Sequence, residues 1–439
     1  MNILVVVVAI IVLVALVAAA KVNPFLAFLG VSIGMALALG VPASDVPPLV
    51  QKGLGGILGG LTIVIVAGAM LGRLVVESGA AQRIATTLVG VFGPSRIGWA
   101  MAATGFVVGI PLFYNVGFVL LVPIVFAIAG RAGLPAVAVA VPALAALSVT
   151  HGLLPPHPAP SGLVKQFDAS LGLTLAYGAV VAVPALAIAG PVFAAFLRRI
   201  EARPPAGLAA RELPIERLPG VASSMLTALL PAILLAVSTA VEIAAPRTAA
   251  GSSVLRFVTH PDVVMLLTLA VAAVTLGIAR GRPLADVMAT YGAALADVGP
   301  VLLVVAGAGP FKEVLVATGV DRQIAAAFAG TALDPLVLAW LVTVAIRVCV
   351  GSATVAGLTA ASLLAPLVAD PARGVDPNLM VLAVGSGSLA CSHVNDAGFW
   401  LFREYFGASI ADTFRCWTAM ETIVSVVGLA GVLVLDRIL

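Results

Sequence analysis

The chain has 439 residues, of which 62% are hydrophobic and only 10% are charged, and its formal net charge at pH 7 is +3. A soluble domain of this length needs far more charge on its surface, so the composition excludes one and predicts an all-α polytopic membrane protein. The small net charge and the lack of a basic cluster exclude a nucleic-acid partner, and no cysteine or histidine spacing suggests a metal or another cofactor.

The first half of the chain is predicted to hold five membrane spans, each of which needs about 20 apolar residues. The candidate ranges are 3–20, 24–41, 58–76, 134–150 and 172–197. The stretch 98–130 is too long for one helix and is interrupted at 109–117, so we expect a re-entrant hairpin of two half-length helices. The first apolar run lacks the basic start of a signal peptide, and we expect it to be retained as a helix.

The second half repeats this order. Its predicted spans are 221–244, 261–279, 297–318, 377–392 and 419–436, and its broken segment is 335–368, with the interruption at 349–357. The hydrophilic linker 198–220 contains five arginines, which places it in the cytoplasm by the positive-inside rule. The distribution of the other basic residues then favours both termini on the outer side.

The two halves share a sequence pattern. Ala67-Gly68-Ala69 is echoed by Ala306-Gly307-Ala308, and in both halves a broken segment and then an apolar helix ending near a histidine follow. This shared order predicts an internal repeat, 1–197 and 221–439. Five spans is an odd number, so the second half starts from the opposite side of the bilayer and the repeat is predicted to be inverted.

The two interruptions are the first candidate site. Broken helices persist at membrane depth only where protein or a water-filled cavity supplies hydrogen-bond partners, and paired breaks mark the binding site of many transporters. The polar and flexible residues at the breaks are Tyr114, Asn115, Gly351, Ser352 and Thr354. We expect helix N-termini and hydroxyl groups there to bind an anion. The alternative is two kinked helices whose polar residues satisfy their own backbone.

Two further segments carry ionisable groups. In 151–160, four prolines are expected to prevent a helix, and His151 and His157 could bind an anion or relay protons; the alternative is a rigid outer loop with hydrated histidines. The segment 393–400 holds His393, Asn395 and Asp396. We interpret Asp396, and secondarily His393, as proton-coupling groups, with His393 and Asn395 also available to substrate. The alternative is a helix start capped by Asn395 or Asp396.

Arg347 lies in the first arm of the second hairpin, where its guanidinium needs a carboxylate from the protein or from the substrate. Glu77, Lys312, Glu313 and Glu421 also lie within or at the ends of spans, where pairing or snorkelling to the interface is the simpler interpretation. These residues together predict a secondary transporter that imports a small organic anion with protons. The carboxylate would dock at the hairpin tips and at Arg347 or a histidine.

Several motifs resemble the gluconate permease family of the ion-transporter superfamily. They are GIPLFYNVGFVLLVPIVF at 109–126, HGLLPPHPAP at 151–160, GSATVAG at 351–357, HVNDAGFW at 393–400 and METI at 420–423. The resemblance implies a bacterial inner-membrane proton symporter for gluconate or a related sugar acid. It also implies a homodimer with scaffold and transport domains and an elevator-like movement.

One position departs from that family. Its members usually have an acidic residue after the two aromatics of the first hairpin, where this chain has Asn115, and Tyr114 replaces a more usual Phe. Coupling would then rest on Asp396 or a histidine, or the substrate or ion differs. A sodium-coupled carrier of a small carboxylate or D-amino acid is therefore the main alternative. Two other function classes are an intramembrane enzyme and a passive channel. The sequence shows no nucleophile paired with a base that would let the histidines act in an enzyme. A passive channel would leak substrate without a gradient.

Overall fold

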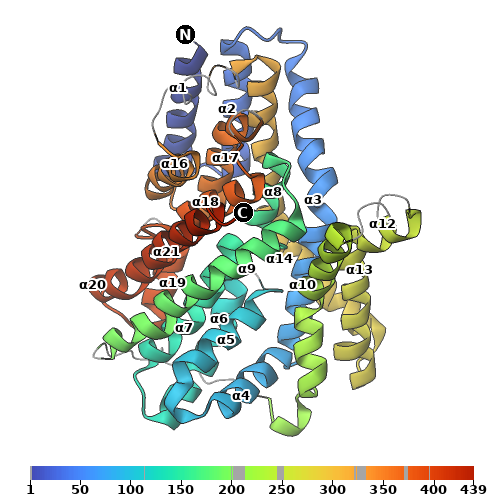
Figure 1. Cartoon of the computed structure of the whole chain (residues 1–439), viewed down its shortest axis with the longest axis vertical. Helices are drawn as coiled ribbons and strands as arrows, with labels where there is room; N and C mark the ends of the chain where they lie inside the picture. The colour runs from blue at the N-terminus through green and yellow to red at the C-terminus, as the bar shows by residue number, and fades with distance from the viewer. Residues whose placement is uncertain are drawn as a thin grey trace.

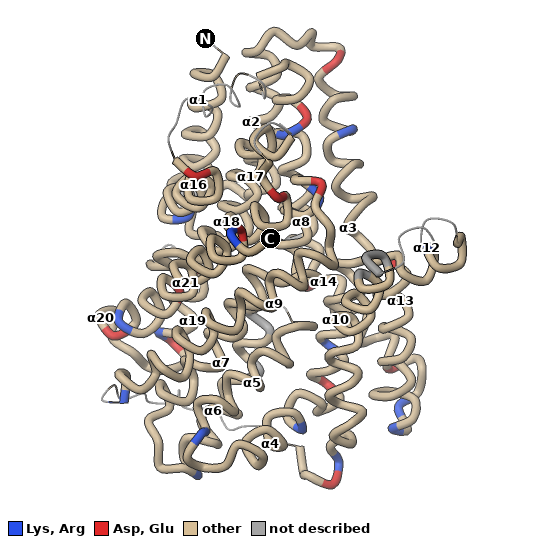
Figure 2. The backbone as a smooth tube through the Cα atoms, in the orientation of Figure 1, with Lys and Arg blue, Asp and Glu red and all other residues tan. Residues whose placement is uncertain are grey.

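The computed structural model describes residues 2–112, 114–198, 200, 213–244, 252–320, 323, 333–369, 374–394 and 396–439. Across these ranges the regular secondary structure is helical throughout. Seven of the described helices are long and apolar enough to cross a membrane. Charged residues are sparse along the backbone, and long stretches of helix carry none (Figure 2). The predicted all-α polytopic membrane protein is thus confirmed.

The first half contains nine α-helices within the described residues. They are α1 (Asn2–Val14), α2 (Pro24–Ala38), α3 (Val46–Glu77), α4 (Ala80–Phe92), α5 (Ile97–Gly109), α6 (Tyr114–Ala132), α7 (Ala136–Leu153), α8 (Pro158–Phe167) and α9 (Leu171–Ala187). Short π-helical segments extend α1 and α9. The N-terminus and α4 lie at opposite ends of the long axis of the molecule (Figure 1).

The second half follows a similar course. Its described helices are α10 (Val221–Ala244), α12 (Ser253–Thr259), α13 (Pro261–Ala272), α14 (Leu284–Ala317), α16 (Pro335–Val350), α17 (Ala353–Ala369), α18 (Pro377–Leu389), α19 (Ala397–Phe406), α20 (Ile410–Thr413) and α21 (Ala419–Asp436). A π-helical segment, Phe414–Thr418, joins α20 to α21 into one apolar span of 27 residues.

Both predicted interruptions coincide with helix ends. In the first, α5 ends at Gly109 and α6 begins at Tyr114. In the second, α16 ends at Val350 and α17 begins at Ala353, and Gly351 between them has a φ of 78°, a left-handed conformation that glycine adopts at little cost. Two helix breaks, 240 residues apart, therefore leave backbone groups without intrahelical partners inside otherwise apolar sequence.

The expectation that prolines exclude a helix from 151–160 is wrong. Helix α7 continues through His151 to Leu153, and α8 begins at Pro158. Proline is tolerated in the first turn of a helix because the N–H that it lacks would have no partner there. The break is therefore confined to residues 154–157, which include Pro155 and Pro156, whereas Pro158 and Pro160 lie in the first turn of α8.

Helices α3 and α14 are longer than their predicted spans, 58–76 and 297–318, because an apolar window detects only the apolar part of a helix. They pack against each other through glycines. A Cβ atom on Gly53 would lie 2.5 Å from the Pro310 nitrogen, and one on Gly309 would lie 2.2 Å from the Gly53 oxygen. Further along α3, a Cβ on Gly72 would lie 2.2 Å from the Pro111 oxygen, so the first helix break packs directly against α3.

Candidate substrate cavity

A cavity of about 440 Å³ opens where the two helix breaks approach each other, between α7, α14, α19 and α21. It brings together seven of the residues predicted from the sequence. These are Tyr114, His151, Arg347, Gly351, Ser352, Thr354 and Asp396. The cavity volume lies within the roughly 300–1,000 Å³ that small-molecule sites occupy. Segments far apart in the sequence thus build one polar chamber.

The N-terminal ends of three helices face this cavity. Its lining includes the first residue of each helix: Tyr114 of α6, Ala353 of α17 and Ala397 of α19. The first N–H groups of a helix have no intrahelical partner, and the aligned peptide dipoles give that end a partial positive charge. An anion placed between these ends would meet both N–H donors and favourable dipoles.

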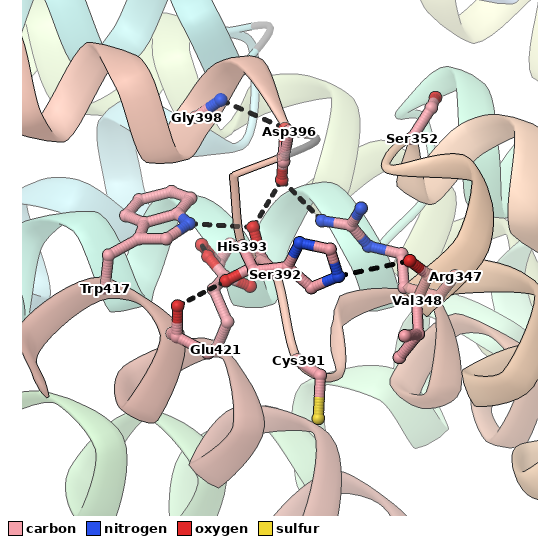
Figure 3. A network of polar contacts seen from close by, with 12 residues as sticks. Arg347, Val348, Ser352, Cys391, Ser392, His393, Asp396, Gly398, Trp417 and Glu421 are labelled. Atoms are coloured by element: carbon pink, nitrogen blue, oxygen red, sulfur yellow. Dashed lines mark hydrogen bonds and ion pairs between the residues drawn. The ribbon is translucent and has the colours of Figure 1, made fainter. Parts of the chain in front are cut away.

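Arg347 supplies a full positive charge at the same place. Its side chain is only 2% exposed, and its Nη2 atom donates to the Asp396 carboxylate in an ion pair (Figure 3). The guanidinium has other nitrogens to satisfy, and Nε and Nη1 have no hydrogen-bond partner among the described residues. A buried donor without a partner costs free energy, so an acceptor in the cavity would stabilise the site.

Asp396 is held in place by several donors. It accepts a hydrogen bond from the Gly398 N–H at 3.0 Å, as the N-cap of α19, and one from the Ser392 hydroxyl at 2.5 Å. Ser392 in turn accepts a hydrogen bond from Trp417 Nε1 at 2.7 Å (Figure 3). The capping role considered for Asp396 from the sequence is confirmed, and the protein supplies the carboxylate that Arg347 needed.

Glu421 also lines the cavity and was not among the predicted site residues. It is 3% exposed, and its Oε1 accepts a hydrogen bond from the Ser148 hydroxyl of α7. The sequence placed Glu421 near the start of a span at 419–436, where a carboxylate could reach the interface. The continuous helical segment begins at Ile410 instead, so Glu421 lies well inside it. A longer window over 410–436 would have detected this buried acid.

A second, smaller cavity of about 280 Å³ adjoins the first and shares Asp297 with it. Arg73 of α3 bridges two acids there, donating to Asp297 at 2.6 Å and to Glu77 at 2.9 Å. Arg73 and Asp297 are 34% and 52% exposed, so this ion pair stands at an open mouth of the chamber. The predicted pairing of Glu77 is confirmed.

The remaining predicted residues lie elsewhere. The His157 ring nitrogen Nε2 is 2.7 Å from the Gly109 oxygen, where it supports the end of α5 rather than the cavity. The His393 Nε2 is 3.1 Å from the Val348 oxygen, and His393 does not line the chamber. Asn395 and the side chain of Asn115 are outside the described part of the structure. Among described residues, no group of three acids, histidines or cysteines could hold a metal ion.

Comparison with known proteins supplies close relatives. The high-affinity gluconate transporter of Escherichia coli K12 is 43% identical over 440 residues, and the match covers 100% of both chains. The Gnt-II system L-idonate transporter of the same organism is 43% identical, with 95% of each chain covered. The gluconate permease of Bacillus subtilis 168 is 42% identical over the full length of both chains.

Solved structures share the fold at much lower identity. The YdaH transporter of Alcanivorax borkumensis superimposes with a TM-score of 0.66 at 18% identity, covering 95% of this chain and 98% of that one. MtrF of Neisseria gonorrhoeae gives a TM-score of 0.65 at 14% identity, covering 97% and 96%. The family model described as GntP family permease matches residues 1–438. This chain therefore belongs to the GntP family of permeases, as the motifs in its sequence predict.

Proposed function

We propose that this protein imports gluconate or a closely related sugar acid together with a proton. The observation that carries the proposal is Arg347, a buried guanidinium with two nitrogens that have no partner among the described residues, in a chamber faced by three helix N-termini. Relatives that cover 100% and 95% of this chain are named for gluconate and L-idonate, which are both six-carbon sugar acids. A carboxylate is the ligand that this arrangement favours, because it neutralises the free donors and accepts from them.

In this proposal the substrate carboxylate accepts from a guanidinium nitrogen of Arg347 that has no described partner, Nε or Nη1, beside the α17 N-terminus. The sugar hydroxyls then have neutral partners around the chamber. The Tyr114 hydroxyl and the His151 Nδ1 atom are buried without a described partner, and Ser352 and Thr354 line the cavity opposite. A site that matches several substrate hydroxyls discriminates strongly against acids that lack them, because its buried polar groups would be left unpaired.

The coupling ion is a proton in this proposal, and the chemistry of the chamber supports that choice. Three carboxylates and an imidazole line it, from Asp297, Asp396, Glu421 and His151, and these are groups that can carry a proton. The coupling roles assigned to Asp396 and His393 from the sequence stay predictions. A sodium-coupled carrier remains the second candidate, with the hydroxyls and carbonyls at 351–354 as its ligands.

The architecture that we propose around this site is an inverted repeat of 1–197 and 221–439, joined by a cytoplasmic linker at 198–220. Each half then contributes one hairpin, 98–130 or 335–368, whose tip reaches the chamber. The Ala-Gly-Ala motifs on α3 and α14 support the repeat, because they lie on two helices that pack together. We further propose a homodimer in a bacterial inner membrane, since the relatives reported above are bacterial.

Uptake by proteoliposomes tests the proposed function. Purified protein should accumulate labelled gluconate inside when the outside is more acidic, and a sodium gradient at equal pH should not drive it. Arg347→Gln should abolish accumulation, whereas Arg403→Gln, on α19 but outside the lining residues of the cavity, should not. Accumulation that follows sodium and ignores an uncoupler would favour the sodium carrier. Gluconate binding that survives Arg347→Gln would remove the basis of the proposed site.

A further inference from the structure

Glu421 differs from the other acids of the chamber in having no countercharge. It is 3% exposed, it lies inside the apolar segment 410–436, and it forms no ion pair with any described residue. Its described hydrogen-bond partner is the neutral Ser148 hydroxyl. A buried carboxylate is costly in its charged form when no cation accompanies it.

Asp396 has the opposite environment. Its carboxylate pairs with the Arg347 guanidinium and accepts hydrogen bonds from the Ser392 hydroxyl and the Gly398 N–H. Asp396 and Glu421 thus differ in their partners: the first has a cation and two hydrogen-bond donors, and the second has one neutral hydroxyl among the described residues.

Other ionisable groups that face Glu421 do not replace the missing cation. The cavity also contains Tyr114, His151, Asp297, Arg347 and Asp396, and Cys416 lies one turn and a residue earlier on the same helical segment. Arg347 is the single cation among these lining residues, and it is engaged with Asp396. An anionic Glu421 would therefore repel an anionic substrate across the same chamber.

We propose that Glu421 carries the coupled proton, and that Asp396 holds Arg347 in position. This inference rests on the function proposed above. On the outer side, a proton from water adds to the Glu421 carboxylate, and gluconate then binds beside a neutral acid. On the inner side, gluconate leaves and the proton returns to water. One proton and one monovalent anion cross together, so the net charge moved is zero and no covalent bond of the substrate changes.

Thermodynamic linkage makes this coupling reciprocal. If protonation of Glu421 strengthens gluconate binding, then gluconate strengthens proton binding by the same factor. Ser148 acts as a positioning residue, because its hydroxyl donates to Oε1 and leaves Oε2 for the proton. The two side chains come from α7 and α21, 273 residues apart in sequence, so the pair forms only when the chamber is assembled.

Three measurements on purified, full-length protein test the inference. In a weakly buffered medium whose pH is high enough for Glu421 to be ionised before gluconate binds, wild type should take up about one proton per gluconate bound. Glu421→Gln, a mimic of the neutral acid, should bind gluconate with no proton uptake and with an affinity that is independent of pH. In proteoliposomes it should exchange labelled for unlabelled gluconate but never concentrate it. Asp396→Asn should bind gluconate more weakly yet still take up the proton, and Glu216→Gln, an exposed control, should behave as wild type.

The outcomes separate this inference from the proposed function. Uphill uptake or normal proton uptake by Glu421→Gln would overturn the assignment, and so would the failure of this folded variant to bind gluconate. A wild type that binds gluconate without proton uptake at every pH tested, including a pH where free Glu421 is ionised, would instead contradict proton symport itself. If Glu421→Gln does not fold, Ser148→Ala decides. Loss of the hydroxyl donor should move the midpoint of pH-dependent gluconate binding to higher pH, and an unmoved midpoint would overturn the inference.

Discussion

Arg347 and Asp396 are 49 residues apart in the sequence and form a buried ion pair at the edge of the chamber. Asp396 engages Nη2 of the guanidinium, and Nε and Nη1 have no partner among the described residues. The protein thus orients the arginine with its own carboxylate and keeps part of the fork for a ligand. Bidentate recognition of a carboxylate depends on such a planar fork, which lysine lacks.

Arg347→Lys should therefore weaken gluconate binding although it preserves the charge. Loss of a charge-assisted hydrogen bond costs about 1.5–3 kcal/mol, which corresponds to roughly a 10- to 100-fold weaker affinity. Titration calorimetry on purified protein measures this directly. Arg403→Lys is the control, because that side chain pairs with Glu404 outside the chamber. An affinity within twofold of wild type for Arg347→Lys would contradict the predicted contact.

Asp396→Asn should separate capping from ion pairing. Asparagine caps helices as well as aspartate does, so α19 should still form, but Arg347 would be left as a buried cation without a partner. Removing one member of a buried pair costs about 3–5 kcal/mol, and the 21% exposure of the Asp396 side chain places this case near the lower end.

Thermal unfolding in detergent, combined with a double-mutant cycle, checks this prediction. The variant carrying both Arg347→Gln and Asp396→Asn should be more stable than the sum of the single losses predicts, because it leaves no charge unpaired. Strictly additive losses would mean that the pair contributes no coupling energy.

Gly72→Ala should disturb the first helix break, between α5 and α6. A Cβ atom there would lie 2.2 Å from the Pro111 oxygen, and backbone must move to relieve that contact. Overpacking of this kind costs about 1–3 kcal/mol, and here it displaces the tip that begins α6. We expect a lower melting temperature and slower gluconate exchange.

Gly59→Ala is the matched control on the same helix, since no atom lies within 4 Å of a Cβ at that position. Replacing an unhindered helical glycine by alanine should leave stability unchanged or raise it by up to about 1 kcal/mol. Equal effects of the two substitutions would indicate that α3 responds to helix propensity and not to the Pro111 contact.

The helix breaks could be predicted from the sequence because glycine and proline alter the backbone conformation at their own positions. Gly351 ends α16 in a left-handed conformation, and Pro111 lies between α5 and α6, each within an apolar run that makes the interruption visible. The residues beside them line the chamber for the same local reason. Prolines at 155–160 were misread because their effect depends on position: Pro158 occupies the first turn of α8, where it is tolerated.

Tertiary partners could not be predicted in this way. The sequence left open whether a protein or a substrate carboxylate meets Arg347, and the answer depends on how α16 and the segment before α19 pack. Glu421 was missed because the polar side chains in 410–418 hide the true start of its helical segment from an apolar window. The short helices α4, α8 and α19 were missed as well, since amphipathic helices of 10–13 residues fall below an apolar window of 20.

The mouth of the chamber gives a last prediction, in which two substitutions have opposite signs. Asp297 lines both cavities and pairs with Arg73, so Asp297→Asn removes a negative charge from the path of an anion and leaves Arg73 paired with Glu77 alone. Gluconate should then bind severalfold more tightly at low ionic strength. Arg73→Gln leaves Asp297 without that cation and should weaken binding by a similar factor.

Both effects should fade with salt and leave stability almost unaltered. The two side chains are 34% and 52% exposed, and such pairs contribute at most about 1 kcal/mol to folding. Exposed charges are screened within a Debye length, which is about 3 Å at 1 M salt against about 10 Å at 0.1 M. Titrations of both variants at the two salt concentrations decide the matter. Shifts of the same sign, or shifts that persist at 1 M, would mean that the pair acts by shaping the mouth and not by its charge.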